Sequence, residues 1–135
     1  MKYLTLTLAF VFLFIFMSCS KTKLEKRVRG TWNVTKVEFS VAINGFTFND
    51  VGQNVSGTIT FSKNGIGNQN YSFVYAGTTY DFDDNFTYTL SEEYITTSHT
   101  DKWLRLINEK SLQKVKYTEV VSDTETRTYT LTLEK

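Results

Sequence analysis

The chain has 135 residues, of which 41% are hydrophobic, 16% aromatic and 21% charged, and its formal net charge is +1. This length suits a single domain, because two cores of half the size would each bury too little apolar surface. A net charge so close to zero gives no indication of nucleic acid as a partner. With one cysteine and one histidine, the chain can form neither an intramolecular disulfide nor an ordinary structural zinc site, so we expect no cofactor.

Residues 1–18 are typical of an export signal. Lys2 places a positive charge at the start, and an apolar run from Leu4 to Met17 follows it. The run is shorter than the roughly 20 residues that a membrane-spanning helix needs. Ser18 then provides the small residue that such signals carry at the cleavage site, directly before Cys19.

The segment Phe16-Met17-Ser18-Cys19 resembles the lipobox of bacterial lipoproteins, which usually has Leu where this chain has Phe16. The resemblance implies cleavage before Cys19, a diacylglycerol on its sulfur and a third acyl chain on its amine. Two or more acyl chains anchor a protein stably in a membrane. The expected partner is therefore a lipid bilayer, in which acylated Cys19 anchors the protein. The implied location is the bacterial cell envelope, on either side of the outer membrane. A plain secretory signal and an uncleaved short anchor are the alternatives.

Residues 19–29 form a basic stem between this signal and the predicted domain. The stem carries five Lys or Arg side chains and a single acidic one, Glu25. Such a stem is either attracted to an anionic bilayer or is a solvated linker. Leu24 and Val28 are four residues apart, which predicts a single helical turn that Gly30 ends.

From Gly30 onward, apolar and polar residues alternate with a period of two, as in half-buried antiparallel strands. Asn44-Gly45 and Asn64-Gly65 are typical of hairpin turns. The acidic and polar run at 83–85 predicts a further break. We expect strands at 31–43, 55–63, 66–75, 78–82, 86–91, 93–99, 102–107, 111–121 and 126–134.

This succession of short strands predicts an all-β domain over residues 30–135. An antiparallel up-and-down barrel of eight strands is favoured, because a closed barrel leaves no exposed edge; a β-sandwich is the alternative. In the first strand the inward side chains change phase between Val34 and Val37, which predicts a bulge near Thr35 and Lys36.

The opening Gly30-Thr31-Trp32 and the hairpin from Gly57 to Gly65 resemble those of small bacterial lipocalin-like lipoproteins. The resemblance covers roughly residues 30–135. It implies that Trp32 closes one end of the barrel and that a basic residue near the last strand, for which Arg127 is the candidate, lies over the Trp32 ring. The T-D-Y turn of the lipocalin family is not recognisable in this chain.

Aromatic residues on the predicted inward faces allow two functions. In the first, the barrel binds a small hydrophobic or amphipathic molecule. In the second, the rings fill the lumen, and the barrel is a protein-binding adaptor, an inhibitor or a structural envelope lipoprotein. A large internal cavity would favour the first function, and its absence the second. The candidate ligand-binding residues are Phe61, Phe73, Tyr75, Tyr88, Tyr117 and Tyr129.

Residues that could support catalysis or metal binding have simpler explanations. His99 has no identifiable nucleophile beside it, so a structural role is expected. The run 81–85 has acidic residues at calcium-loop spacing, but Phe86 stands where such a loop needs glycine. Glu92 and Glu93 have no partner acid or base. We therefore expect a protein that is not an enzyme and has no catalytic or metal-binding residues.

Overall fold

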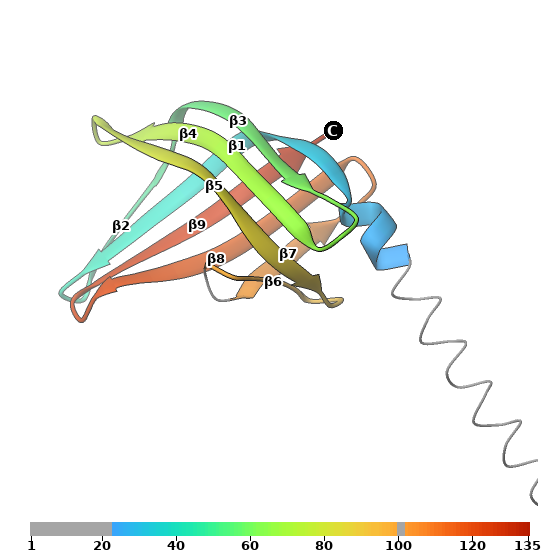
Figure 1. The fold of residues 1–135 in the computed structure, drawn as a ribbon. Helices are drawn as coiled ribbons and strands as arrows, with labels where there is room; N and C mark the ends of the chain where they lie inside the picture. The colour runs from blue at the N-terminus through green and yellow to red at the C-terminus, as the bar shows by residue number, and fades with distance from the viewer. Residues whose placement is uncertain (1–22, 100–101) are drawn as a thin grey trace, which may run out of the picture.

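The computed structural model describes residues 23–99 and 102–135, which form one antiparallel sheet in addition to a helical turn at residues 23–28 (Figure 1). Sheet neighbours follow the order β2-β1-β3-β4-β5-β6-β7-β8-β9. The strands are β1 (Gly30–Ile43), β2 (Phe46–Val51), β3 (Gln53–Phe61), β4 (Ile66–Tyr75), β5 (Thr78–Leu90), β6 (Tyr94–Thr97), β7 (Lys102–Asn108), β8 (Leu112–Ser122) and β9 (Glu125–Glu134).

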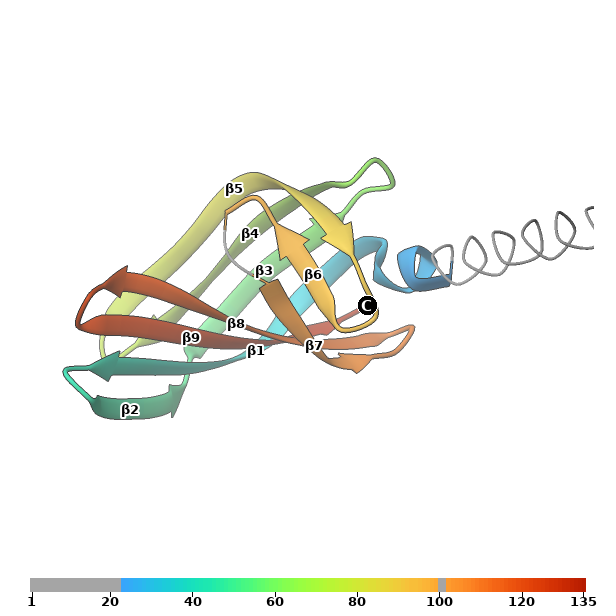
Figure 2. The ribbon, with the colours of Figure 1, turned by 90° about the horizontal axis from the view of Figure 1, so that it is seen from below.

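Pairing between the first and the last strand closes the sheet. β1 pairs with β9 from Asn33, opposite Glu134, to Ile43, opposite Glu125. The closed ring contains β1 and β3 to β9, and β2 is an additional strand (Figure 2). The predicted eight-stranded up-and-down barrel is therefore confirmed, and the β-sandwich is excluded.

β1 changes its neighbour along its length. Residues 30–33 pair with β3, whereas residues 38–43 pair with β2. The hairpin between β1 and β2 turns at Asn44 and Gly45, both with positive φ (50° and 84°), as a two-residue turn requires. Within the described sheet β2 pairs with β1 alone, so its second edge is open. β2 was not among the predicted strands, because its alternation of apolar and polar residues is broken at Asp50 after only four residues.

β5 is continuous where a break was predicted, so the two expected strands 78–82 and 86–91 are one. The polar residues at 83–85 face amide side chains on β4, which satisfy them by hydrogen bonds between the strands. The pairs are Asp83 with Asn70 at 3.3 Å, Asp84 with Gln69 at 2.8 Å and Asn85 with Asn68 at 3.1 Å.

Two local predictions are confirmed. The register of β1 against β9 shifts between Val34 and Lys36, where the bulge was expected. The helical turn at residues 23–28 buries Val28 completely against the barrel. The core therefore fills the barrel lumen and extends to this turn at one end.

Candidate functional site

The end of the barrel next to the helical turn is closed by Trp32, which is fully buried. Its indole Nε1 donates a hydrogen bond to the Val28 carbonyl at 2.7 Å. The Lys135 ammonium lies 4.4 Å from the centroid of the Trp32 ring and donates a hydrogen bond to the Arg29 carbonyl. Gly30 enters β1 with φ of +114°, a conformation that other residues rarely adopt. These contacts join the stem, the first strand and the C-terminus.

The assignment of Arg127 as the basic residue over Trp32 was wrong. Lys135 occupies that position, whereas the Arg127 guanidinium lies over the Tyr80 ring, 5.7 Å from its centroid, at the other end of the barrel. Arg127 also forms an ion pair with Glu125 at 2.8 Å. Lys135 directly follows β9. The pairing register of β9 determines which basic side chain lies over the Trp32 ring, and this register could not be predicted from the sequence.

The residues predicted to line a ligand cavity pack against one another in the lumen. Tyr117 is stacked between Trp103 at 5.0 Å and Tyr129 at 4.8 Å, and Phe61 meets Tyr88 edge-on at 5.1 Å. Five of the six candidates are buried, namely Phe61, Phe73, Tyr88, Tyr117 and Tyr129; the sixth, Tyr75, is partly buried. Rings fill the lumen at these positions.

The buried phenols have partners inside the protein. The Tyr71 and Tyr117 hydroxyls are 3.1 Å apart, Tyr88 donates to the Ser62 carbonyl, and Tyr129 donates to Glu119. Burial raises the pKa of Tyr71, Tyr117 and Tyr129 above the usual range for tyrosine. No ligand is needed to satisfy these hydroxyl groups.

The barrel wall is incomplete between β5 and β8. β6 pairs with β5 only at residues 88–90, and β7 pairs with β8 only at residues 113–116. The preceding part of β5 and the following part of β8 therefore have no strand partner on this side of the barrel among the described residues. A cavity of about 50 Å³ lies behind this gap. Its walls are Gln69, Phe82, Phe86, Thr97, His99, Trp103, Tyr117 and Glu119.

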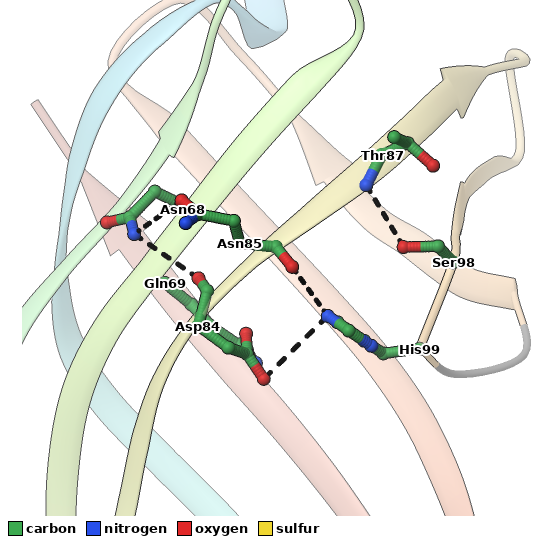
Figure 3. Close-up of polar contacts among 7 residues, drawn as sticks. All are labelled: Asn68, Gln69, Asp84, Asn85, Thr87, Ser98 and His99. Carbon is green, nitrogen blue, oxygen red and sulfur yellow. Dashed lines mark hydrogen bonds and ion pairs between the residues drawn. The ribbon is translucent and has the colours of Figure 1, made fainter.

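Polar contacts hold the rim of this cavity together, as Figure 3 shows. Gln69 Nε2 donates to Asp84 Oδ1 at 2.8 Å, while Gln69 Oε1 is buried without a hydrogen-bond partner. His99 Nε2 lies 2.6 Å from the Asn85 carbonyl and 3.8 Å from an Asp84 carboxylate oxygen. Ser98 accepts a hydrogen bond from the backbone N–H of Thr87. His99 thus has a structural role that ties the chain after β6 to β5.

At the end away from Trp32, two hairpins present apolar side chains to solvent. The hairpins β1–β2 and β8–β9 lie side by side, and the Asn44 N–H donates to the Thr124 carbonyl at 2.9 Å (Figure 1). Phe46 is 72% exposed and Phe48 is 55% exposed. We call the following residues the far-end apolar surface: Ile43, Phe46, Phe48, Val120 and Val121.

Cys19 and the export signal lie outside the described residues. Within the described part of the chain, no helix is long and apolar enough to cross a membrane. The same residues contain no group of three His, Cys, Asp or Glu side chains arranged to hold a metal ion.

The chain matches no protein-family model, no curated protein and no solved structure. Its function is therefore inferred from the barrel, the open edge of β2 and the chemistry of the residues described above.

Proposed function

We propose that the protein is a bacterial envelope lipoprotein whose rigid barrel binds an extended strand of another protein. Acylated Cys19 would anchor it to the outer membrane. The observation that carries the proposal is the open edge of β2, beside the exposed rings of Phe46 and Phe48. The filled lumen favours this function over carriage of an apolar molecule.

The hydrogen-bonding groups of β2 suit a strand partner. In a two-residue hairpin the residues that flank the turn, here Ile43 and Phe46, form a hydrogen-bonded pair, and the pairs alternate from there. The backbone groups of Thr47 and Asn49 therefore point to the open edge. The strand contains neither Lys nor Pro, the residues that commonly protect such edges. An added strand would satisfy its backbone and cover its aromatic rings.

The position of the anchor leaves this edge accessible. Lys23 is four residues after Cys19, so the acyl chains are within about 14 Å of it. The helical turn that begins at Lys23 packs at the end closed by Trp32. β1 runs from that end for 14 residues, about 45 Å, to the hairpin with β2. The far-end apolar surface thus points away from the membrane.

A second copy of the chain fits this edge poorly. Two β2 strands related by a two-fold axis would pair antiparallel, and the axis would be normal to the sheet. That rotation reverses the direction of the barrel and points the two anchors in opposite directions. Copies in one membrane cannot meet this condition, so the partner is a different protein.

Site-specific photo-crosslinking in cells tests the proposal. A photoreactive amino acid at position 48 should crosslink one identifiable protein, while the same amino acid at Leu106, which is 47% exposed on β7, should not. With that partner purified, Thr47→Pro should weaken binding at least about tenfold, because it removes a backbone donor from the open edge. Thr47→Ala is the matched control and should bind normally.

Equal crosslinking at positions 48 and 106, or unchanged binding by Thr47→Pro, would overturn the proposal. A crosslinked dimer of this chain would identify a second copy as the occupant instead. Saturable binding of a fatty-acid probe by the full chain, abolished by Ile59→Trp, would favour the carrier function.

A further inference from the structure

The hydrogen-bonding pattern of β2 determines which of its side chains a partner strand meets most closely. Phe46, Phe48 and Asp50 occupy alternate positions, and their backbone groups bond to β1. A strand added at the open edge bonds instead to Thr47 and Asn49. In antiparallel pairing, the partner residues opposite the other three then form non-hydrogen-bonded pairs, in which facing Cα atoms are only about 4.5 Å apart. Positions 46, 48 and 50 therefore select the side chains of the partner.

Two of these positions extend the apolar inward face of the barrel to the open edge. Val41, opposite Phe48, and Phe39, opposite Asp50, are both buried on the inward face of β1. Phe46 and Phe48 continue this face, where they are 72% and 55% exposed. Apolar side chains opposite the two rings would cover them, and pairs of an aromatic with a β-branched residue across strands stabilise a sheet.

Asp50 places a carboxylate over the end of the same edge. The Val51 N–H comes two residues after that of Asn49, so it points to the open edge as well. Asp50 Oδ1 accepts a hydrogen bond from this N–H at 2.7 Å. The carboxylate therefore leans toward the side on which a partner strand would lie.

The charge of Asp50 has no cation beside it. In the part of the chain that the structure describes, no Lys or Arg forms an ion pair with Asp50. The carboxylate of Glu38, on the opposite face of the sheet, has ion pairs with both Lys36 at 2.8 Å and Lys114 at 3.0 Å. A cation on the partner would therefore find an unpaired carboxylate at position 50.

The course of β4 indicates the direction of the partner strand. β2 and β3 are separated by Gly52 alone, and β4 pairs with β3 as far as Gln53, opposite Val74. β4 ends at Tyr75 and turns back into β5, which leaves the place beside β2 unoccupied among the described residues. A strand in this place that runs antiparallel to β2 keeps the pattern of every described pair in the sheet.

We propose that the strand bound by β2 runs antiparallel to it and carries the pattern cation-x-apolar-x-apolar. A Lys or Arg lies opposite Asp50, and β-branched or aromatic residues lie opposite Phe48 and Phe46. The residues between them are polar, because they share a face with the side chains of Thr47 and Asn49. This inference rests on the proposed function, since it specifies the partner of the same edge.

Hydrogen exchange of the full chain in detergent micelles, measured by nuclear magnetic resonance, tests the pattern with synthetic peptides. One peptide has the central sequence Lys-Thr-Ile-Thr-Ile, and the second has the same residues in reverse order. The first should protect the backbone N–H groups of Thr47 and Asn49 from exchange, because both point to the open edge. The reversed peptide should bind about fivefold more weakly, because it places Lys opposite Phe46 and Ile opposite Asp50.

The role of the Asp50 charge is tested separately. A peptide with Glu in place of Lys should bind the wild type about fivefold more weakly. Asp50→Asn keeps an acceptor for the Val51 N–H and should remove this preference. Asp123→Asn is the matched control, because it removes an exposed carboxylate from the tip of the neighbouring hairpin, and it should retain the preference.

The outcomes separate this inference from the proposed function. If no peptide at millimolar concentration protects Thr47 and Asn49, both are overturned. Equal or tighter binding of the reversed peptide would overturn the direction and pattern. A preference for Lys that Asp50→Asn leaves unchanged would overturn the selection of a cation by Asp50. In these last two cases the binding of a strand at the edge of β2 still stands.

Discussion

Trp32 connects the stem and the first strand, which are adjacent in sequence, to Lys135, which is far from them in sequence. Its indole N–H bonds to Val28 in the stem, its ring is fully buried in the lumen, and Lys135 covers it from the C-terminus. This single side chain therefore holds the helical turn at residues 23–28 against the closed end of the barrel. The importance of Trp32 could be predicted from its place at the start of the first strand, but its cationic partner could not.

Replacing Trp32 by alanine should lower the free energy of unfolding by about 3–5 kcal/mol, because the substitution leaves a large cavity in the closed end. Urea unfolding followed by circular dichroism measures this loss. Lys135→Met, which removes the cation over the ring and its hydrogen bond to the Arg29 carbonyl, should cost about 1–2 kcal/mol. A loss below about 1 kcal/mol for Trp32→Ala would show that the closed end does not depend on the indole.

Cys19→Ala should abolish incorporation of labelled fatty acid, because Cys19 is the only cysteine in the chain. The variant should also leave the membrane fraction or accumulate as a precursor. Ser20→Ala is the matched control next to it and should be labelled normally. Unchanged labelling of Cys19→Ala would remove the basis for the lipid anchor.

At the scale of elements, alternation predicted where strands run but not always where they end. The polar run at 83–85 was interpreted as a break because nothing in the sequence shows that β4 supplies amide partners for it. The strand β2 was missed because its short alternation is broken at Asp50. Both errors have the same cause. Whether a segment forms a strand depends on the neighbouring strand that pairs with it, and the residues of the segment itself do not show which strand that is.

The turn between β4 and β5 offers a stabilising substitution. Ala76 has φ of 48° and Gly77 has φ of 78°, so an L-residue with a Cβ occupies a left-handed position. Asn tolerates this conformation better than Ala, and Ala76→Asn should raise the free energy of unfolding by about 1 kcal/mol. Gly77→Ala should lower it, because it adds a second strained residue. Urea midpoints for both variants check the expectation, and a destabilised Ala76→Asn would contradict it.

At the scale of the whole molecule, the closed barrel could be predicted from alternation, but the state of its lumen could not. A list of inward aromatic residues does not say whether the rings line a space or fill it. The stack of Trp103, Tyr117 and Tyr129 decides this in favour of filling. The cavity beside Gln69 was not predicted either, because it depends on where β6 and β7 stop pairing with their neighbours.

The filled lumen has a consequence for stability in alkali. Tyr71, Tyr117 and Tyr129 keep their protons to a higher pH in the folded barrel than in the unfolded chain, because burial raises their pKa. Above about pH 10 the unfolded state binds fewer protons than the folded state, so the free energy of unfolding should fall as pH rises. Below that pH these phenols are neutral in both states and should add no pH dependence.

Urea unfolding from about pH 8 to about pH 11 measures how the free energy of unfolding changes with pH. Tyr117→Phe should make the decline shallower, whereas Tyr94→Phe, a half-buried ring under Lys102, should leave it unchanged. Equal slopes for the wild type and Tyr117→Phe would show that the buried phenols do not control the alkaline transition.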